Sequence, residues 1–199
     1  MKNLLKEIPL ITKSIIGIAI TFFLINLIFD LSGLQLNHYL GLYHYSNEKF
    51  NLFQIFTFSF MHDTNPLHLI YNILYLLLIG AQCETIIQRD FFKLVLFTIF
   101  INIIGIQIIQ VDMNYVGLST IGFSIMTCFL LLKNKLNSVI NFSLKLMIAL
   151  FIFDETFGFL RNFTNGIFNF EFHTHYAHVL GILSGILFYL YIRYKKGVN

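Results

Sequence analysis

Charged residues are scarce in this sequence, and their scarcity excludes an ordinary soluble domain. Only 12% of the 199 residues are charged and 57% are hydrophobic, whereas a soluble domain carries about 25% charged residues. The composition predicts an integral membrane protein, all-α and polytopic, with one domain over residues 1–199. The net charge of +3 does not indicate nucleic-acid binding, because the basic residues gather where a membrane protein needs them.

Tryptophan is absent, and there are only two cysteines and two prolines. Both cysteines, Cys83 and Cys128, fall in apolar runs, which argues against a disulfide framework and against a thiolate metal site. The first apolar run is about as long as a spanning helix, so the N-terminus lacks the pattern of a cleavable signal peptide. No repeat or low-complexity linker divides the chain.

Six apolar segments predict six transmembrane helices. Several approach the roughly 20 residues that cross the hydrocarbon core of a bilayer, and the fourth and fifth are shorter. The predicted helices cover about residues 11–31, 66–83, 91–111, 116–132, 144–160 and 176–192. Residues 32–65 are amphipathic and rich in phenylalanine, which predicts an interfacial or partly embedded loop between the first two helices.

The basic residues predict the orientation in the membrane. Eleven of the 13 lie in the N-terminal tail, in the second and fourth loops and after the last helix. Only Lys49 and Arg161 fall on the other side. Because cytoplasmic loops carry the excess of Lys and Arg, both termini are expected in the cytoplasm and residues 32–65 outside.

With this orientation, four polar side chains lie at a similar depth near the outer surface. Ser119 is near the outer end of the fourth helix, and His178 is near the outer start of the sixth. His68 and Asn72 are one turn apart on one face of the second helix. Polar groups inside a membrane cost free energy unless they are paired or wetted, so these four are candidates for function.

The residue types fit nucleophilic catalysis. A serine hydroxyl becomes a nucleophile when an adjacent base takes its proton, so His178 is the expected base for Ser119. His68, Asn72 and the backbone N–H of Ser119 are the expected donors to an oxyanion. No buried acid is evident as a partner for His178, so the sequence predicts a dyad. Asp154 and Glu155 either face the cavity or mark a helix end.

Two glycines support close packing around these residues. Gly181 and Gly185 form a small-xxx-small face one and two turns after His178. They would allow the sixth helix to press against the fourth and bring His178 to Ser119.

These motifs resemble the rhomboid family of intramembrane serine proteases from about residue 53 to the end of the sixth helix. The matching pieces are His68 and Asn72, then Gly80 and Glu84 at the family spacing, then Gly117-Leu118-Ser119, and finally Ala177-His178 with Gly181 and Gly185. The resemblance implies a six-helix bundle, Ser119 as nucleophile, His178 as base, His68 and Asn72 at the oxyanion, and single-pass membrane proteins as substrates. It implies no cofactor.

The serine has two candidates, because the family motif Gly-x-Ser-Gly fits Gly117–Thr120 and Gly122–Ile125 equally, each without the second glycine. Ser119 is preferred over Ser124 because the family often carries an aromatic four residues after the nucleophile, and Phe123 stands there. Thr120 replaces the second glycine and could crowd the oxyanion site. Phe53-Gln54 stands where the family usually has Trp-Arg, so a structural ion pair is expected to be missing.

Two other functions compete with a protease. One is an inactive relative of the same fold that binds transmembrane helices. The other is a metal-binding membrane protein, because histidines cluster on the outer side: His62, His68, His173, His175 and His178. No carboxylate or cysteine completes an obvious ligand set. The lipid bilayer and transmembrane substrates are the expected partners, and a bacterial plasma membrane is the expected location.

Overall fold

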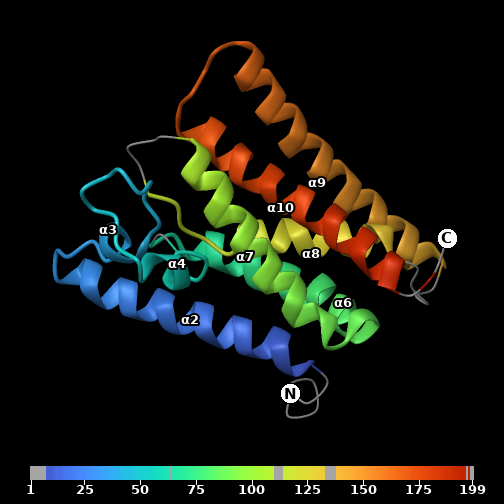
Figure 1. Ribbon diagram of the computed structural model, residues 1–199. Helices are drawn as coiled ribbons and strands as arrows, with labels where there is room; N and C mark the ends of the chain where they lie inside the picture. Colours follow the sequence, from blue (N-terminus) through green and yellow to red (C-terminus); the bar gives the residue numbers. More distant parts are fainter. Residues whose placement is uncertain (1–7, 63, 110–113, 133–137, 196, 198–199) are drawn as a thin grey trace.

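The computed structural model describes residues 8–62, 64–109, 114–132, 138–195 and 197, and its regular structure is helical. Figure 1 shows the long helices gathered in one bundle. The helices are α2 (Leu10–Leu31), α3 (Asn37–Leu40), α4 (Gln54–Thr57), α5 (Pro66–Tyr75), η1 (Leu76–Gly80), α6 (Ala81–Ile87), α7 (Asp90–Ile108), α8 (Ser119–Leu131), α9 (Ser138–Thr164) and α10 (Phe170–Lys195). The elements α5, η1 and α6 form one continuous rod with a single π-helical turn in its middle.

Helix α8 is the centre of the bundle. Residues 120–129 are all buried, and α8 contacts α5, η1, α6, α7, α9 and α10, with α10 as its main neighbour. At 13 residues it is only about 20 Å long, which is too short to cross a bilayer core of about 30 Å. It has half the length of α10, which has 26 residues.

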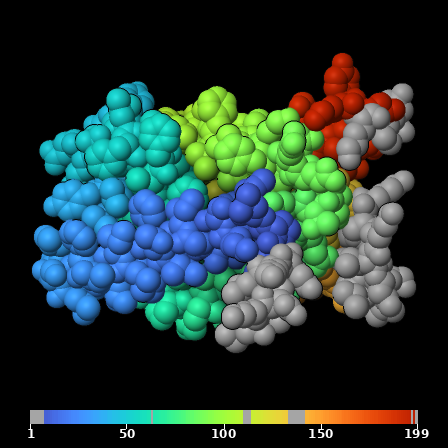
Figure 2. Space-filling view, turned by 90° about the horizontal axis from the view of Figure 1, so that it is seen from below, coloured from blue at the N-terminus to red at the C-terminus, as the bar shows by residue number. Residues whose placement is uncertain are grey.

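Helix α2 lies on the outside of the bundle, as Figure 2 shows. Only 17% of its apolar window is buried, so most of its surface faces lipid. Glu84 of α6 fixes its beginning, because the Glu84 carboxylate accepts the backbone N–H groups of Ile11 and Thr12 and the hydroxyl of Thr12. The carboxylate satisfies donors that the first turn of a helix leaves unpaired, so Glu84 has a structural role.

The segment between α2 and α5 forms a folded loop at one end of the bundle, opposite the start of α2 and the end of α10 (Figure 1). Gln54 is buried at its centre, donates to the carbonyls of Tyr39 and Lys49, and accepts from backbone N–H groups of Tyr43 and Asn51. The family usually has an arginine at this position, and its ion pair was expected to be missing here. The neutral Gln54 amide holds the loop by hydrogen bonds to the backbone instead.

The observed helices coincide with the six apolar segments but differ from them at their ends. Within the described residues, four of them are long and apolar enough to span a membrane: α2, the rod of residues 66–87, α7 and α10. The predictions for the last two helices were too short, because α9 covers 138–164 rather than 144–160 and α10 begins at Phe170 rather than 176. The added start of α10 carries Glu171, His173 and His175, and the added end of α9 carries Arg161, so hydropathy does not mark these turns.

Candidate active site

Ser119 is the first residue of α8, and the strand-like segment before it sets its position. Tyr115 pairs with Leu42 through two backbone hydrogen bonds of 2.9 Å, and the N–H of Gly117 donates to the carbonyl of Phe58 at 3.0 Å. Gly117 has φ +117°, a backbone conformation that favours glycine. The segment therefore enters the bundle from the loop and ends at Ser119.

Ser119 and His178 lie within hydrogen-bond distance. The Nε2 atom of His178, on α10, is 3.0 Å from the hydroxyl of Ser119. The ring of Phe123 lies 4.5 Å from the His178 ring, tilted by 30°, so it packs on one face of the imidazole. His178 thus contacts both Ser119 and the aromatic ring four residues after it.

The close approach of α8 and α10 depends on two glycines. A Cβ on Gly181 would collide with the backbone carbonyl of Thr120, and a Cβ on Gly185 would lie 2.5 Å from the carbonyl of Ser124. Both contacts are with backbone, so a side chain would force the helices apart. The methyl of Thr120 also points to this interface, 3.0 Å from the Cβ position of Gly181.

Ser124 is placed differently from Ser119. It is fully buried, and its hydroxyl accepts a hydrogen bond of 2.7 Å from Thr98 of α7. The Ser124 hydroxyl thus joins α8 to α7, and its partner in the described part of the chain is Thr98 rather than a histidine. The geometry favours Ser119 over Ser124.

His68 and Asn72 of α5 border the same site. The Cβ position of Gly117 lies 3.5 Å from Cε1 of His68 and 3.7 Å from the hydroxyl of Ser119. The amide nitrogen of Asn72 lies 3.2 Å from Nε2 of His62, whose Nδ1 lies 3.1 Å from the carbonyl of Phe60. If His62 donates to that carbonyl, its Nε2 is the acceptor, and it orients the Asn72 amide.

A cavity of about 530 Å³ joins these residues. Its wall includes Ser119, His178, His68 and Asn72, together with the aromatic side chains Phe58, Tyr71, Tyr75, Tyr115, Phe123, Phe151 and Phe170. A mixed polar and aromatic chamber of this size can hold both water and an extended piece of polypeptide.

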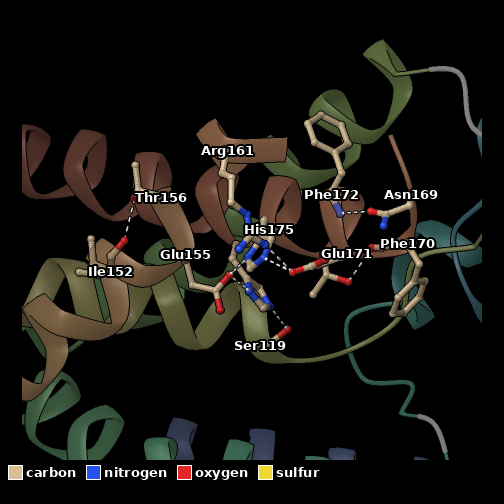
Figure 3. Close-up of polar contacts among 12 residues, drawn as sticks. Ser119, Ile152, Glu155, Thr156, Arg161, Asn169, Phe170, Glu171, Phe172 and His175 are labelled. Carbon is tan, nitrogen blue, oxygen red and sulfur yellow. Dashed lines mark hydrogen bonds and ion pairs between the residues drawn. The ribbon is translucent and has the colours of Figure 1, made fainter. Parts of the chain in front are cut away.

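The structure corrects the expectation that His178 has no acidic partner. Oε2 of Glu155, on α9, lies 2.8 Å from Nδ1 of His178 and 2.6 Å from Nδ1 of His175. The line continues through Glu171, 3.6 Å from Nε2 of His175, to Arg161 at 3.0 Å. Figure 3 shows Ser119, Glu155, His175, Glu171 and Arg161 gathered between α8, α9 and α10.

The outer histidines are engaged with separate partners. His173 lies 3.1 Å from the hydroxyl of Tyr115, His175 contacts Glu155, and His62 contacts Asn72. Within the described ranges, no three His, Cys, Asp or Glu side chains are placed to share a metal ion. The geometry therefore offers the metal-binding alternative no ligand set in that part of the chain.

A protein-family model described as the Rhomboid domain matches residues 49–195. The chain belongs to the rhomboid family. Its long apolar helices and this membership make it a polytopic integral membrane protein. No curated protein sequence matches the chain significantly. The family contains serine proteases and inactive homologues, so membership alone leaves catalysis to be argued from the site.

The sequence analysis left Glu155 undecided and considered His175 only as a possible metal ligand. A signal for Glu155 was present, because a carboxylate within an apolar run needs a partner and often marks function. What the sequence lacks is the rotation of α9 about its axis, which decides whether Glu155 meets α10 or lipid.

Proposed function

We propose that this rhomboid is an intramembrane serine endopeptidase, with Ser119 as nucleophile and His178 as general base. The observation that carries the proposal is the 3.0 Å separation of the Ser119 hydroxyl and His178 Nε2, at the wall of a cavity that can admit a peptide. An isolated serine in a membrane helix usually bonds its own backbone. An imidazole within hydrogen-bond distance supports nucleophilic use instead.

In the proposed first step, the Ser119 oxygen bonds to the scissile carbonyl carbon while its proton moves to Nε2 of His178. The carbonyl π electrons move to oxygen, which becomes an oxyanion. The first turn of α8 supports this charge, because N–H groups at a helix start have no acceptor within the helix. Asn72 and His68 are the proposed side-chain donors. As the carbonyl reforms, the C–N bond breaks and His178 gives its proton to the leaving nitrogen, which leaves an ester on Ser119. Water, deprotonated by His178, then attacks this ester, and the proton returns to the Ser119 oxygen as the carboxylate product leaves.

The proposed substrates are single-pass membrane proteins cut near the outer membrane face. Ser119 begins a short helix that lies below the end of the bundle carrying the loop of residues 32–65. A segment of polypeptide must be extended to react there, so a transmembrane helix that unwinds easily near its outer end suits the site. The proposed location is a bacterial plasma membrane with both termini in the cytoplasm.

The first prediction concerns labelling of the serine. Purified protein in detergent is treated with a fluorescent fluorophosphonate as wild type, Ser119→Ala and Ser124→Ala. Labelling is expected for wild type and Ser124→Ala and is expected to be lost in Ser119→Ala, because the Ser119 hydroxyl borders the cavity and lies 3.0 Å from His178 Nε2, whereas the Ser124 hydroxyl pairs with Thr98. Chelators should not change it.

An active rhomboid protease labelled in parallel checks the conditions. Labelling lost only in Ser124→Ala would move the nucleophile one turn deeper. No labelling of the wild type, with the parallel protease labelled, would favour a non-catalytic rhomboid that binds transmembrane helices.

A further inference from the structure

The side chain of Glu155 completes a line of three residues with Ser119 and His178. Its Oε2 atom is 2.8 Å from Nδ1 of His178, and Nε2 of the same ring is 3.0 Å from the Ser119 hydroxyl. We propose that Glu155 is a positioning residue, which holds His178 in the Nδ1–H tautomer and stabilises its imidazolium during the reaction. This inference rests on the proposed protease function.

Burying the Glu155 carboxylate costs free energy, which is hard to explain without such a role. Its side chain is only 17% exposed, and it follows an apolar stretch of α9, where a carboxylate loses its hydration. The exposed pair of Arg161 and Glu171, at 51% and 53% exposure, already ties α9 to α10 and loses little hydration. Joining the two helices therefore does not require a second, buried acid.

A second imidazole fixes the carboxylate. Nδ1 of His175 is 2.6 Å from Oε2 of Glu155, and the His175 ring rests on α9 at Gly158. A Cβ on Gly158 would lie 2.6 Å from His175 Nε2 and 2.7 Å from Cε1, so a larger residue would displace the ring. Gly158 is three residues after Glu155, on the same face of the helix. Gly158 thus leaves room for the His175 ring, which orients the Glu155 carboxylate.

The protons move as they do in a catalytic triad of serine, histidine and carboxylate. The Ser119 proton moves to Nε2 of His178, and the proton on Nδ1 stays there. The resulting imidazolium faces the negative carboxylate of Glu155, which is not itself protonated. When Nε2 donates its proton to the leaving nitrogen, His178 returns to the same neutral tautomer.

The contact is close but not fully aligned. Nδ1 of His178 has no hydrogen bond of good direction among the described residues, although Glu155 lies within ion-pair distance. Catalytic hydrogen bonds in free enzymes are often misaligned and tighten when substrate binds. Because Glu155 is on α9 and His178 is on α10, a small shift between these helices would complete the bond.

The second prediction compares Glu155→Gln, which keeps the shape and loses the charge, with Glu155→Asp, which keeps the charge. The readout is the rate of fluorophosphonate labelling against probe concentration. For Glu155→Gln the maximal rate is expected to fall about tenfold to a hundredfold. The half-saturating probe concentration should change less than threefold. Glu155→Asp should retain more of the rate than Glu155→Gln.

Lys195→Gln is the matched control, because it removes a charge and an exposed ion pair between α10 and α7 outside the line of contacts through Glu155. Its labelling rate should stay within about twofold of wild type. Equal losses in Lys195→Gln and Glu155→Gln would show that Glu155 only joins the helices. Unchanged labelling of a folded Glu155→Gln protein would overturn the inference but not the proposed function, whereas an unreactive wild type overturns both.

A measurement on the wild type avoids dependence on the folding of a variant. Nitrogen NMR of ¹⁵N-histidine-labelled protein, with the His178 signals assigned by their loss in His178→Gln, reports the tautomer. A proton on Nδ1 of neutral His178 is expected. A neutral ring that carries its proton on Nε2 would contradict the proposed role of Glu155.

Discussion

At the scale of single residues, Asn72 has two neighbours of different kinds. Its amide nitrogen is 3.2 Å from His62 on one side, and its side chain borders the cavity with Ser119 on the other. An amide nitrogen carries two N–H groups, so one can contact His62 while the other donates to an oxyanion. His62 would then orient Asn72 and would not contact the substrate itself.

The third prediction tests this division. Asn72→Ala should lower the labelling rate of Ser119 by about a hundredfold without abolishing it, because one oxyanion donor is lost and others remain. Asn26→Ala is the control, since Asn26 is buried and donates to the backbone carbonyl of His62 but does not border the cavity. A loss in Asn26→Ala as large as in Asn72→Ala would mean that the loop around His62, rather than the donor, sets the rate.

Thr120 illustrates how a departure from the family motif is accommodated. Its methyl group packs toward Gly181 of α10, and the side chain is 8% exposed. Most of the Thr120 side chain thus packs in the interface between α8 and α10. Because Gly181 leaves room for Thr120, the threonine does not prevent the contact between the Ser119 hydroxyl and His178. The sequence had indicated that Thr120 could crowd the oxyanion site.

At the scale of helices, the interface of α8 and α10 sets the distance between Ser119 and His178. The fourth prediction is that Gly185→Ala lowers the free energy of unfolding by about 1–3 kcal/mol, because the new Cβ would lie 2.5 Å from the Ser124 carbonyl and 2.8 Å from Thr127 Cβ. The labelling rate of Ser119 should fall as well. Unfolding in mixed micelles with rising SDS measures the stability.

Gly17→Ala is the matched control for this substitution. A Cβ at Gly17, on the lipid-exposed side of α2, meets nothing within 4 Å, and alanine favours helix over glycine. Its stability should equal or exceed that of wild type. Equal stability of Gly185→Ala and wild type would mean that α8 and α10 separate freely and do not fix the site.

The elements also explain which parts of the site could be predicted. The positions of Phe123, Gly181 and Gly185 relative to Ser119 or His178 could be predicted because each lies within one or two turns of one of them, and helical periodicity fixes such relations. The contact of Glu155 with His178 joins two helices whose rotation and tilt depend on packing along their whole length. Neither periodicity nor hydropathy reports that rotation. The sequence therefore marked Glu155 as unusual but could not give it a partner.

At the scale of the whole molecule, charged side chains mark one end of the bundle. Asp90 at the start of α7 binds Lys93 and, from the end of α10, Lys195. Lys145 of α9 donates to the carbonyl of Leu132, just after α8. The cavity with Ser119 lies toward the opposite end, beside the loop of residues 32–65. If the basic end is cytoplasmic, the catalytic cavity opens to the outside.

The fifth prediction tests this orientation with single cysteines, which is practical because the native Cys83 and Cys128 are both buried. Tyr45→Cys lies in the loop and Tyr194→Cys at the end of α10, and the native side chains are 67% and 88% exposed. A membrane-impermeant maleimide should label Tyr45→Cys in intact cells and Tyr194→Cys only after permeabilisation. The wild type should remain unlabelled in both. The reverse pattern would open the cavity to the cytoplasm, and the substrates would then be cut at their inner ends.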